Sequence, residues 1–131
     1  MAESPTVLCV DDEDTILVTL KLLSESVGLR VITATSAADA LKAFQSEQFH
    51  AAVLDYSLPN VNGIELARQM KQAKPSMPIV FLSAFSELPG ETLGLAEAWF
   101  RKAEHSPEQL LIKLNEMVKR NSVQVAPPIG Q

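Results

Sequence analysis

The chain has 131 residues, of which 47% are hydrophobic and 21% are charged, values typical of a globular domain with a single core. Its net charge of −5 disfavours nucleic acid or an anionic membrane as the main partner, because both favour basic surfaces. The sequence has no apolar run of about 18 residues and no signal-peptide pattern. Its single cysteine, Cys9, is expected in the core, which suits a reducing compartment, so we expect a cytoplasmic protein.

Five short apolar runs predict β-strands. They span residues 6–10, 30–34, 51–55, 78–83 and 98–102. The first, third and fourth are almost continuously apolar, which is typical of strands that are covered on both faces.

The stretches between these runs predict helices. Their expected starts are Asp14 for the first, Ser36 as N-cap with Asp39 for the second, Asn62 as N-cap with Glu65 for the third, and Ser106 as N-cap with Pro107 and Gln109 for the last. Gly28 is expected to end the first helix. A short helix is predicted within 86–97, where one proline and two glycines disfavour a longer one.

The alternation of strands and helices predicts an α/β fold. We expect a doubly wound, five-stranded parallel sheet in the flavodoxin-like order 2-1-3-4-5, with helices on both faces. The domain is expected to span residues 5–120. Residues 121–131 lose the helical periodicity and carry two prolines and a glycine, so they are expected to be a tail or a linker stub. The chain is then either a single-domain protein or a domain cut from a longer one at this tail.

Charged and hydroxyl side chains follow four of the predicted strands. They are Asp11 and Asp12 after the first, Asp55 at the end of the third, Ser83 at the end of the fourth and Lys102 at the end of the fifth. In the predicted topology, ligands bind at the carboxyl ends of strands 1 and 3. Three carboxylates with one lysine remain negative, and the simplest missing positive charge is a hard divalent cation such as Mg²⁺. Asp11 and Asp12 are therefore predicted to bind the metal.

Structural interpretations of single residues stay open. Asp12 or Asp14 could simply cap the first helix, and a lysine after a strand is usually solvated. Glu13 and Asp14 are expected outside the pocket, the first solvated and the second near the helix start. His50 and His105 are expected at the surface, with no metal role.

Four segments together resemble the receiver domains of two-component response regulators, over roughly residues 5–120. They are VDDE after the first strand, VLDYSLPNVNG around Asp55, LSA at the fourth strand and WFRK at the fifth. The resemblance implies that Asp55 accepts a phosphoryl group from a histidine kinase or phosphotransfer protein. It also implies that an unknown output protein or domain responds to the changed surface.

The resemblance further implies roles for the residues around Asp55. Asp11, Asp12 and Asp55 would bind Mg²⁺ with the backbone carbonyl of Ser57, Ser83 would bond a phosphoryl oxygen, Lys102 would pair with the phosphoryl group or the Asp55 carboxylate, and Trp99 would be the switch aromatic. On this reading the chain is not an enzyme, except that it catalyses its own phosphorylation and dephosphorylation.

The chain departs from the family pattern after the lysine. Ala103 stands where the family commonly has a proline with a cis bond. A cis bond before any other residue costs about 2.5–4 kcal/mol, so we expect a trans bond here. The segment 83–102 is also shorter than usual, and the face that its helix shares with the fifth strand is expected to be remodelled. Ser57 and Phe85 occupy positions that the family uses to tune the lifetime of the phosphoryl group.

Two other functions stay open. One is a binding module that keeps the receiver shape and acts without phosphorylation. The other is a phosphohydrolase with the same aspartyl chemistry, which would need a second acid two residues after the nucleophile, where Ser57 stands.

Overall fold

The computed structural model describes residues 4–58, 63–84, 94–102 and 106–125, the stretch 120–125 by its backbone alone. In chain order the elements are β1 (Thr6–Val10), α1 (Asp14–Ser26), β2 (Arg30–Ala34), α2 (Ala37–Ser46), β3 (Ala51–Asp55), α3 (Gly63–Ala73), β4 (Ile79–Ser83), β5 (Ala98–Arg101) and α4 (Pro107–Val125). Every strand begins and ends within one residue of its predicted range.

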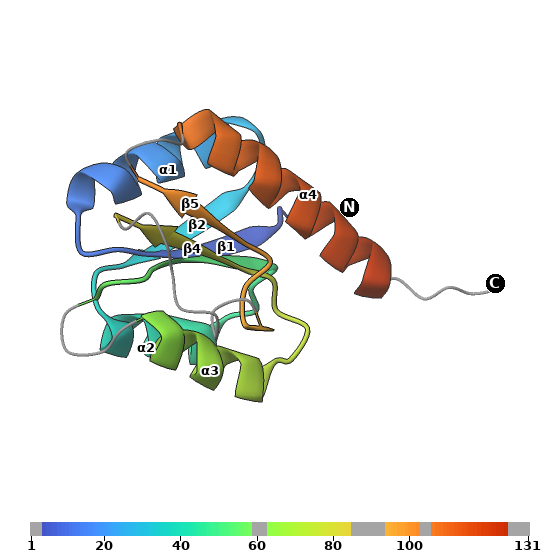
Figure 1. The fold of residues 1–131 in the computed structure, drawn as a ribbon. Helices are drawn as coiled ribbons and strands as arrows, with labels where there is room; N and C mark the ends of the chain where they lie inside the picture. The colour runs from blue at the N-terminus through green and yellow to red at the C-terminus, as the bar shows by residue number, and fades with distance from the viewer. Residues whose placement is uncertain (1–3, 59–62, 85–93, 103–105, 126–131) are drawn as a thin grey trace.

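The strands form one parallel sheet between two layers of helices. Their order is β2-β1-β3-β4-β5, and each neighbouring pair is parallel. Helices α1 and α4 cover one face, and α2 and α3 cover the other (Figure 1). The predicted doubly wound α/β fold is therefore confirmed. Because β1 leads into α1 and β3 leads into α3, the chain leaves the carboxyl ends of these two adjacent strands toward opposite faces of the sheet.

The core consists of two apolar layers, one on each face of the sheet. In β1, Leu8 and Val10 pack into the layer under α2 and α3, whereas Val7 and Cys9 pack into the layer under α1 and α4. Every residue of β1, β3 and β4 is buried, which explains their almost continuous apolar runs. Burial raises the pKa of the Cys9 thiol to about 12, so this core residue stays protonated at neutral pH.

The helix boundaries follow local signals. Gly28 has a φ of +94°, a left-handed conformation that glycine adopts readily, and α1 ends just before it. At the start of α2, the N–H of Asp39 donates to Ser36 Oγ at 3.1 Å. At the start of α4, the N–H of Ser106 donates to Gln109 Oε1 at 2.8 Å, and the N–H of Gln109 donates to Ser106 Oγ at 3.2 Å. Both predicted N-caps are thereby confirmed.

Helix α4 is longer than the sequence predicts. It continues to Val125, so residues 121–125 are helical, although the sequence lacks helical periodicity there. Helix-breaking residues are absent from that stretch, whereas Pro127 disfavours helix at the residue before it. The domain boundary at residue 120 stays a prediction. In the part of the chain that the structure describes, no helix is long and apolar enough to cross a membrane.

The remaining predictions concern His50, the fourth helix and several residues outside the described ranges. His50, expected at the surface, is half-buried beside β1: its Nδ1 accepts the N–H of Thr6 at 3.0 Å, and its backbone N–H donates to the Thr6 carbonyl at 2.8 Å. Residues 94–97 lie in no α-helix, and the rest of the predicted fourth helix falls outside the described residues. Also outside them are Asn62, Phe85, Ala103 and His105, so the predicted trans bond at Ala103 stays a prediction.

Candidate functional site

Charged side chains lie at the carboxyl ends of three strands, on the same side of the sheet. Asp11 directly follows β1, Asp55 is the last residue of β3, and Lys102 directly follows β5. Side chains alternate between the two faces along a strand, and these three continue the rows that pack under α1 and α4. The N–H of Asp11 donates to the Ala34 carbonyl at 3.1 Å, and the N–H of Lys102 donates to the Ser83 carbonyl at 2.8 Å. These bonds extend the ladders and fix the backbone on which the side chains stand.

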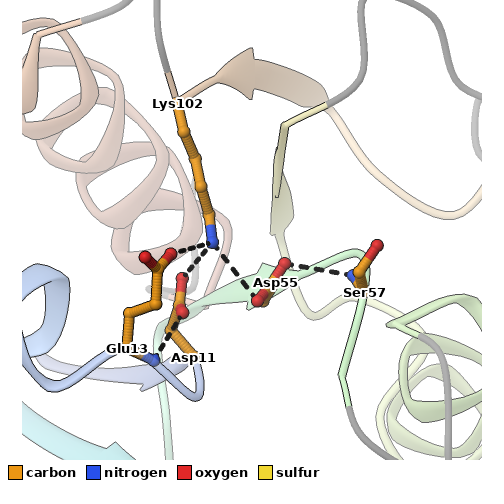
Figure 2. Close-up of polar contacts among 5 residues, drawn as sticks. All are labelled: Asp11, Glu13, Asp55, Ser57 and Lys102. Carbon is orange, nitrogen blue, oxygen red and sulfur yellow. Dashed lines mark hydrogen bonds and ion pairs between the residues drawn. The ribbon is translucent and has the colours of Figure 1, made fainter.

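The Lys102 side chain reaches across the sheet edge to the acids of the other two strands. Its Nζ lies 3.3 Å from Asp55 Oδ2 and 3.0 Å from Asp11 Oδ2 (Figure 2). The side chain is 19% exposed. The structure therefore brings together the lysine and two of the acids that the sequence singled out.

The two buried aspartates have fixed orientations. Asp55 Oδ1 accepts the N–H of Ser57 at 3.0 Å, and Asp11 Oδ1 accepts the N–H of Glu13 at 2.9 Å (Figure 2). Such bonds to the backbone two residues on are typical of aspartate in a turn. In both residues the second oxygen, Oδ2, is left facing Lys102.

The charges at this edge are strongly coupled. Burial raises the pKa of the Asp55 carboxyl to about 6, and the negative charge of Asp11 raises it further. The hydrogen bond from the Ser57 N–H and the positive charge of Lys102 lower this pKa, but they do not outweigh burial. Burial would lower the pKa of the Lys102 ammonium, but its contacts with Glu13 and Asp11 and the charge of Asp55 outweigh burial and raise it. At neutral pH, Asp55 is therefore mostly ionised and Lys102 is protonated.

The acid cluster (Asp11, Asp12 and Asp55) has the chemistry of a cation site. One carboxylate oxygen of each residue lies within 4.8 Å of those of the other two. Asp11 and Asp55 are buried, and Asp12 is exposed. Asp11 Oδ2 is buried and has no hydrogen-bond partner among the described residues; its contact with Lys102, at 3.0 Å, is an ion pair. A buried carboxylate oxygen with free acceptor capacity fits a hard cation such as Mg²⁺.

The two predicted switch residues lie on neighbouring strands. Ser83 is the last residue of β4 and is 1% exposed. Trp99 lies on β5 opposite Phe81 of β4, is half-buried, and packs against the layer under α2 and α3. The guanidinium of Arg101 lies 5.9 Å from the centre of the Trp99 ring. The roles of Ser83 and Trp99, and of the Ser57 carbonyl, stay predictions.

Glu13 was expected to be solvated and outside the pocket; it is exposed, but the second part of the expectation is wrong. Its Oε1 lies 2.8 Å from Lys102 Nζ, although the side chain is 58% exposed (Figure 2). The sheet topology predicts which residues meet at the ends of the strands, and Glu13 is not one of them. Glu13 lies in the turn after β1, and its partner is 89 residues away in the chain. The run of acids after β1 is the one sequence signal that could have pointed to it.

Gly63 supports the carboxyl end of β3 from below. It is the first residue of α3, and its N–H donates to the Tyr56 carbonyl at 2.7 Å. A Cβ at this position would lie 2.6 Å from the Asp55 carbonyl oxygen and 2.9 Å from Tyr56 Cα. Only glycine therefore allows α3 to approach the strand end so closely.

Known proteins are similar to this chain in sequence and in fold. The family model described as "Response regulator receiver domain" matches residues 7–97. The chain is 34% identical over 120 residues to the alkaline phosphatase synthesis transcriptional regulatory protein PhoP of Bacillus subtilis, covering 89% of this chain and 50% of PhoP. It is 30% identical over 128 residues to the response regulator SaeR of Staphylococcus aureus, covering 95% of this chain and 55% of SaeR. The chain thus spans about half the length of these relatives.

A solved structure gives the same result. The crystal structure of a CheY-like response regulator receiver domain protein from Methanospirillum hungatei superposes with a TM-score of 0.85 at 26% identity, covering 93% of this chain and 99% of that one. The family match covers most of the chain, and the sheet order and the acid-rich strand ends agree with it. The chain belongs to the receiver domain family of two-component response regulators.

Proposed function

We propose that the protein is a phosphorylation-dependent switch in which Asp55 accepts a phosphoryl group from a histidine kinase or phosphotransfer protein. Receiver domains are generally signalling modules rather than enzymes, and the proposed chemistry is confined to the domain's own phosphorylation and dephosphorylation. The observation that carries the proposal is the placement of Asp55, a buried carboxylate held between a backbone N–H and a lysine beside two further acids.

In the proposed reaction, Asp55 Oδ2 attacks the phosphorus atom of the donor. An O–P bond forms, and the bond between phosphorus and the donor breaks. Such a transfer needs alignment and compensation of charge more than covalent help. The Ser57 N–H fixes the rotation of the Asp55 carboxylate, and Lys102, 3.3 Å from Oδ2, lies where it can bind a phosphoryl oxygen. The Ser83 hydroxyl, at the end of the adjacent strand, is proposed to bond another.

The acid cluster and the Ser57 carbonyl are the proposed ligands of Mg²⁺. Bound there, Mg²⁺ would compensate the charge of the phosphoryl oxygens. The fit rests on Asp11 Oδ2, a buried oxygen for which the described part of the chain supplies no hydrogen-bond partner. Replacing Asp12 by alanine should weaken binding of Mg²⁺ or Mn²⁺, and unchanged affinity would refute this ligand set.

Acetyl phosphate with Mg²⁺, followed by intact mass spectrometry, tests the proposal. We expect one stable phosphoryl adduct on the wild-type protein and none on Asp55→Asn, in which one oxygen becomes an amide of the same shape. Asp14→Asn is the matched control, because it makes the same chemical change three residues from Asp11 and should still be labelled. Continuous release of phosphate would indicate a hydrolase, absence of labelling would indicate a binding module, and labelling of Asp55→Asn at Asp11 or Asp12 would move the acceptor.

The partners are proposed by class. A histidine kinase or phosphotransfer protein is the proposed donor, and an output protein or domain is the proposed reader of the phosphorylated surface. The name of PhoP describes a transcriptional regulatory protein, and the matching segment is half of it. The free thiol of Cys9, buried in the core, suits a reducing compartment, so we place the switch in the cytoplasm.

A further inference from the structure

We infer that Glu13 is a positioning residue for Lys102: its carboxylate keeps the Lys102 ammonium at the site when the acid cluster is engaged with a divalent cation. The inference rests on the proposed function and deepens it. Glu13 acts through Lys102 and needs no contact with the metal or with the phosphoryl group.

Three carboxylates surround the Lys102 ammonium, which carries three N–H donors. Its Nζ lies 2.8 Å from Glu13 Oε1, 3.0 Å from Asp11 Oδ2 and 3.3 Å from Asp55 Oδ2. These are all the ion pairs of Lys102 within the described residues. The contact with Glu13 is the shortest, and Glu13 is the one partner that lies outside the acid cluster.

The other two partners serve both cations. Asp11 and Asp55 pair with Lys102, and they also belong to the acid cluster proposed for Mg²⁺. A carboxylate that coordinates a divalent cation has less charge to offer an ammonium, and the two cations repel each other at this distance. Lys102 ends in a strongly hydrated charge on a flexible stem, so without a third partner it would turn toward water. Glu13 supplies that partner.

The position of Glu13 suits this role. It is the residue before α1, and within the described residues its side chain makes no capping hydrogen bond, so the carboxylate does not cap the helix. Its backbone N–H donates to Asp11 Oδ1, which fixes it beside the site. The backbone of Lys102 is fixed in turn by the bond of its N–H to the Ser83 carbonyl. The Glu13–Lys102 ion pair therefore joins two anchored segments, and neither of its two charged groups is a candidate metal ligand.

The test is nuclear magnetic resonance of the Lys102 side chain, assigned with Lys102→Arg, in the full chain with and without Mg²⁺. The two Hε protons of a lysine have distinct shifts when the side chain is held and one averaged shift when it moves freely. We expect distinct shifts in the wild type under both conditions. In Glu13→Gln, which removes the charge and keeps the length, we expect distinct shifts without Mg²⁺ and an averaged shift with it. The control Asp14→Asn should behave like the wild type.

Two results of the resonance measurement would each overturn the inference and leave the proposed metal site standing. One is that Glu13→Gln keeps distinct Lys102 shifts in Mg²⁺, and the other is that the wild type loses them. The backbone amide shifts of residues 11–14 report metal binding separately. If these shifts do not change when Mg²⁺ is added to the wild type, the proposed metal site is wrong, and so is the inference that rests on it. Labelling by acetyl phosphate should also slow by up to about fivefold in Glu13→Gln, the size expected of a partly exposed ion pair. Equal rates in Glu13→Gln and Asp14→Asn would contradict the inference.

Discussion

Replacing Gly63 by alanine should destabilise the protein and disturb the proposed phosphoacceptor at the same time. The new Cβ would lie 2.6 Å from the Asp55 carbonyl oxygen, 2.9 Å from Tyr56 Cα and 3.1 Å from Phe81 Cε1. The two shortest contacts are with backbone atoms, which cannot rotate away as the end of a side chain can. Either α3 must move away from β3, or the carboxyl end of β3 must shift.

The expected cost follows from these contacts. Overpacking in a core typically costs about 1–3 kcal/mol, and the higher helix propensity of alanine returns less than about 1 kcal/mol. We therefore expect the free energy of unfolding to fall by about 2 kcal/mol, which corresponds to a drop in Tm of roughly 6–10 °C for a domain of this size. Labelling of Asp55 by acetyl phosphate should also slow, because the atom that the Cβ displaces is the Asp55 carbonyl oxygen.

Urea unfolding followed by circular dichroism measures the effect on stability. Gly94→Ala is the control, because its Cβ would meet no described atom within 4 Å. If Gly63→Ala is as stable as Gly94→Ala and is labelled at the wild-type rate, the close approach of α3 to β3 does not require glycine and the reasoning is wrong.

Three further predictions concern serines and Asp55. Ser24→Ala should raise the free energy of unfolding by up to about 1 kcal/mol in urea unfolding, because its buried hydroxyl has no hydrogen-bond partner in the segments that the structure describes, whereas Ser26→Ala should not. Burial raises the pKa of Asp55 from 3.8 to about 6, so the folded state binds a proton that the unfolded chain has already released, and stability falls as the pH rises through that window. Without divalent cations, the free energy of unfolding of Asp55→Asn should therefore rise relative to that of the wild type by on the order of 2–3 kcal/mol as the pH goes from 4 to 7. A difference between the two proteins that does not change with pH would contradict this. Ser83→Ala should still be labelled but should lose the response of Trp99 fluorescence to beryllofluoride, and an unchanged response would mean that the signal leaves Asp55 by another path.

The sequence predicted the sheet well because its signals are local. Strands buried on both faces are continuous apolar runs, and their alternation with helices restricts the topology to few arrangements. The meeting of Lys102 with Asp55 followed from that topology, since the carboxyl ends of parallel strands lie at one edge. Glu13 did not follow, because its role depends on the direction of a side chain toward a partner 89 residues away. The close approach at Gly63 is likewise a distance between elements that no local pattern contains.

The charge of the acid-rich site depends on whether β5, the last strand to be synthesised, has joined the sheet. All the acids of the site lie within the first 55 residues, whereas their lysine arrives with the last strand. A nascent chain that ends before β5 therefore carries an uncompensated cluster of negative charge. Among the described residues, β5 is half-buried and pairs with one strand, β4, so a single ladder holds it in the sheet, while its arrival relieves that repulsion. Whenever β5 detaches by local unfolding, Lys102 leaves with it, and the site returns to the charge state of the unfinished chain.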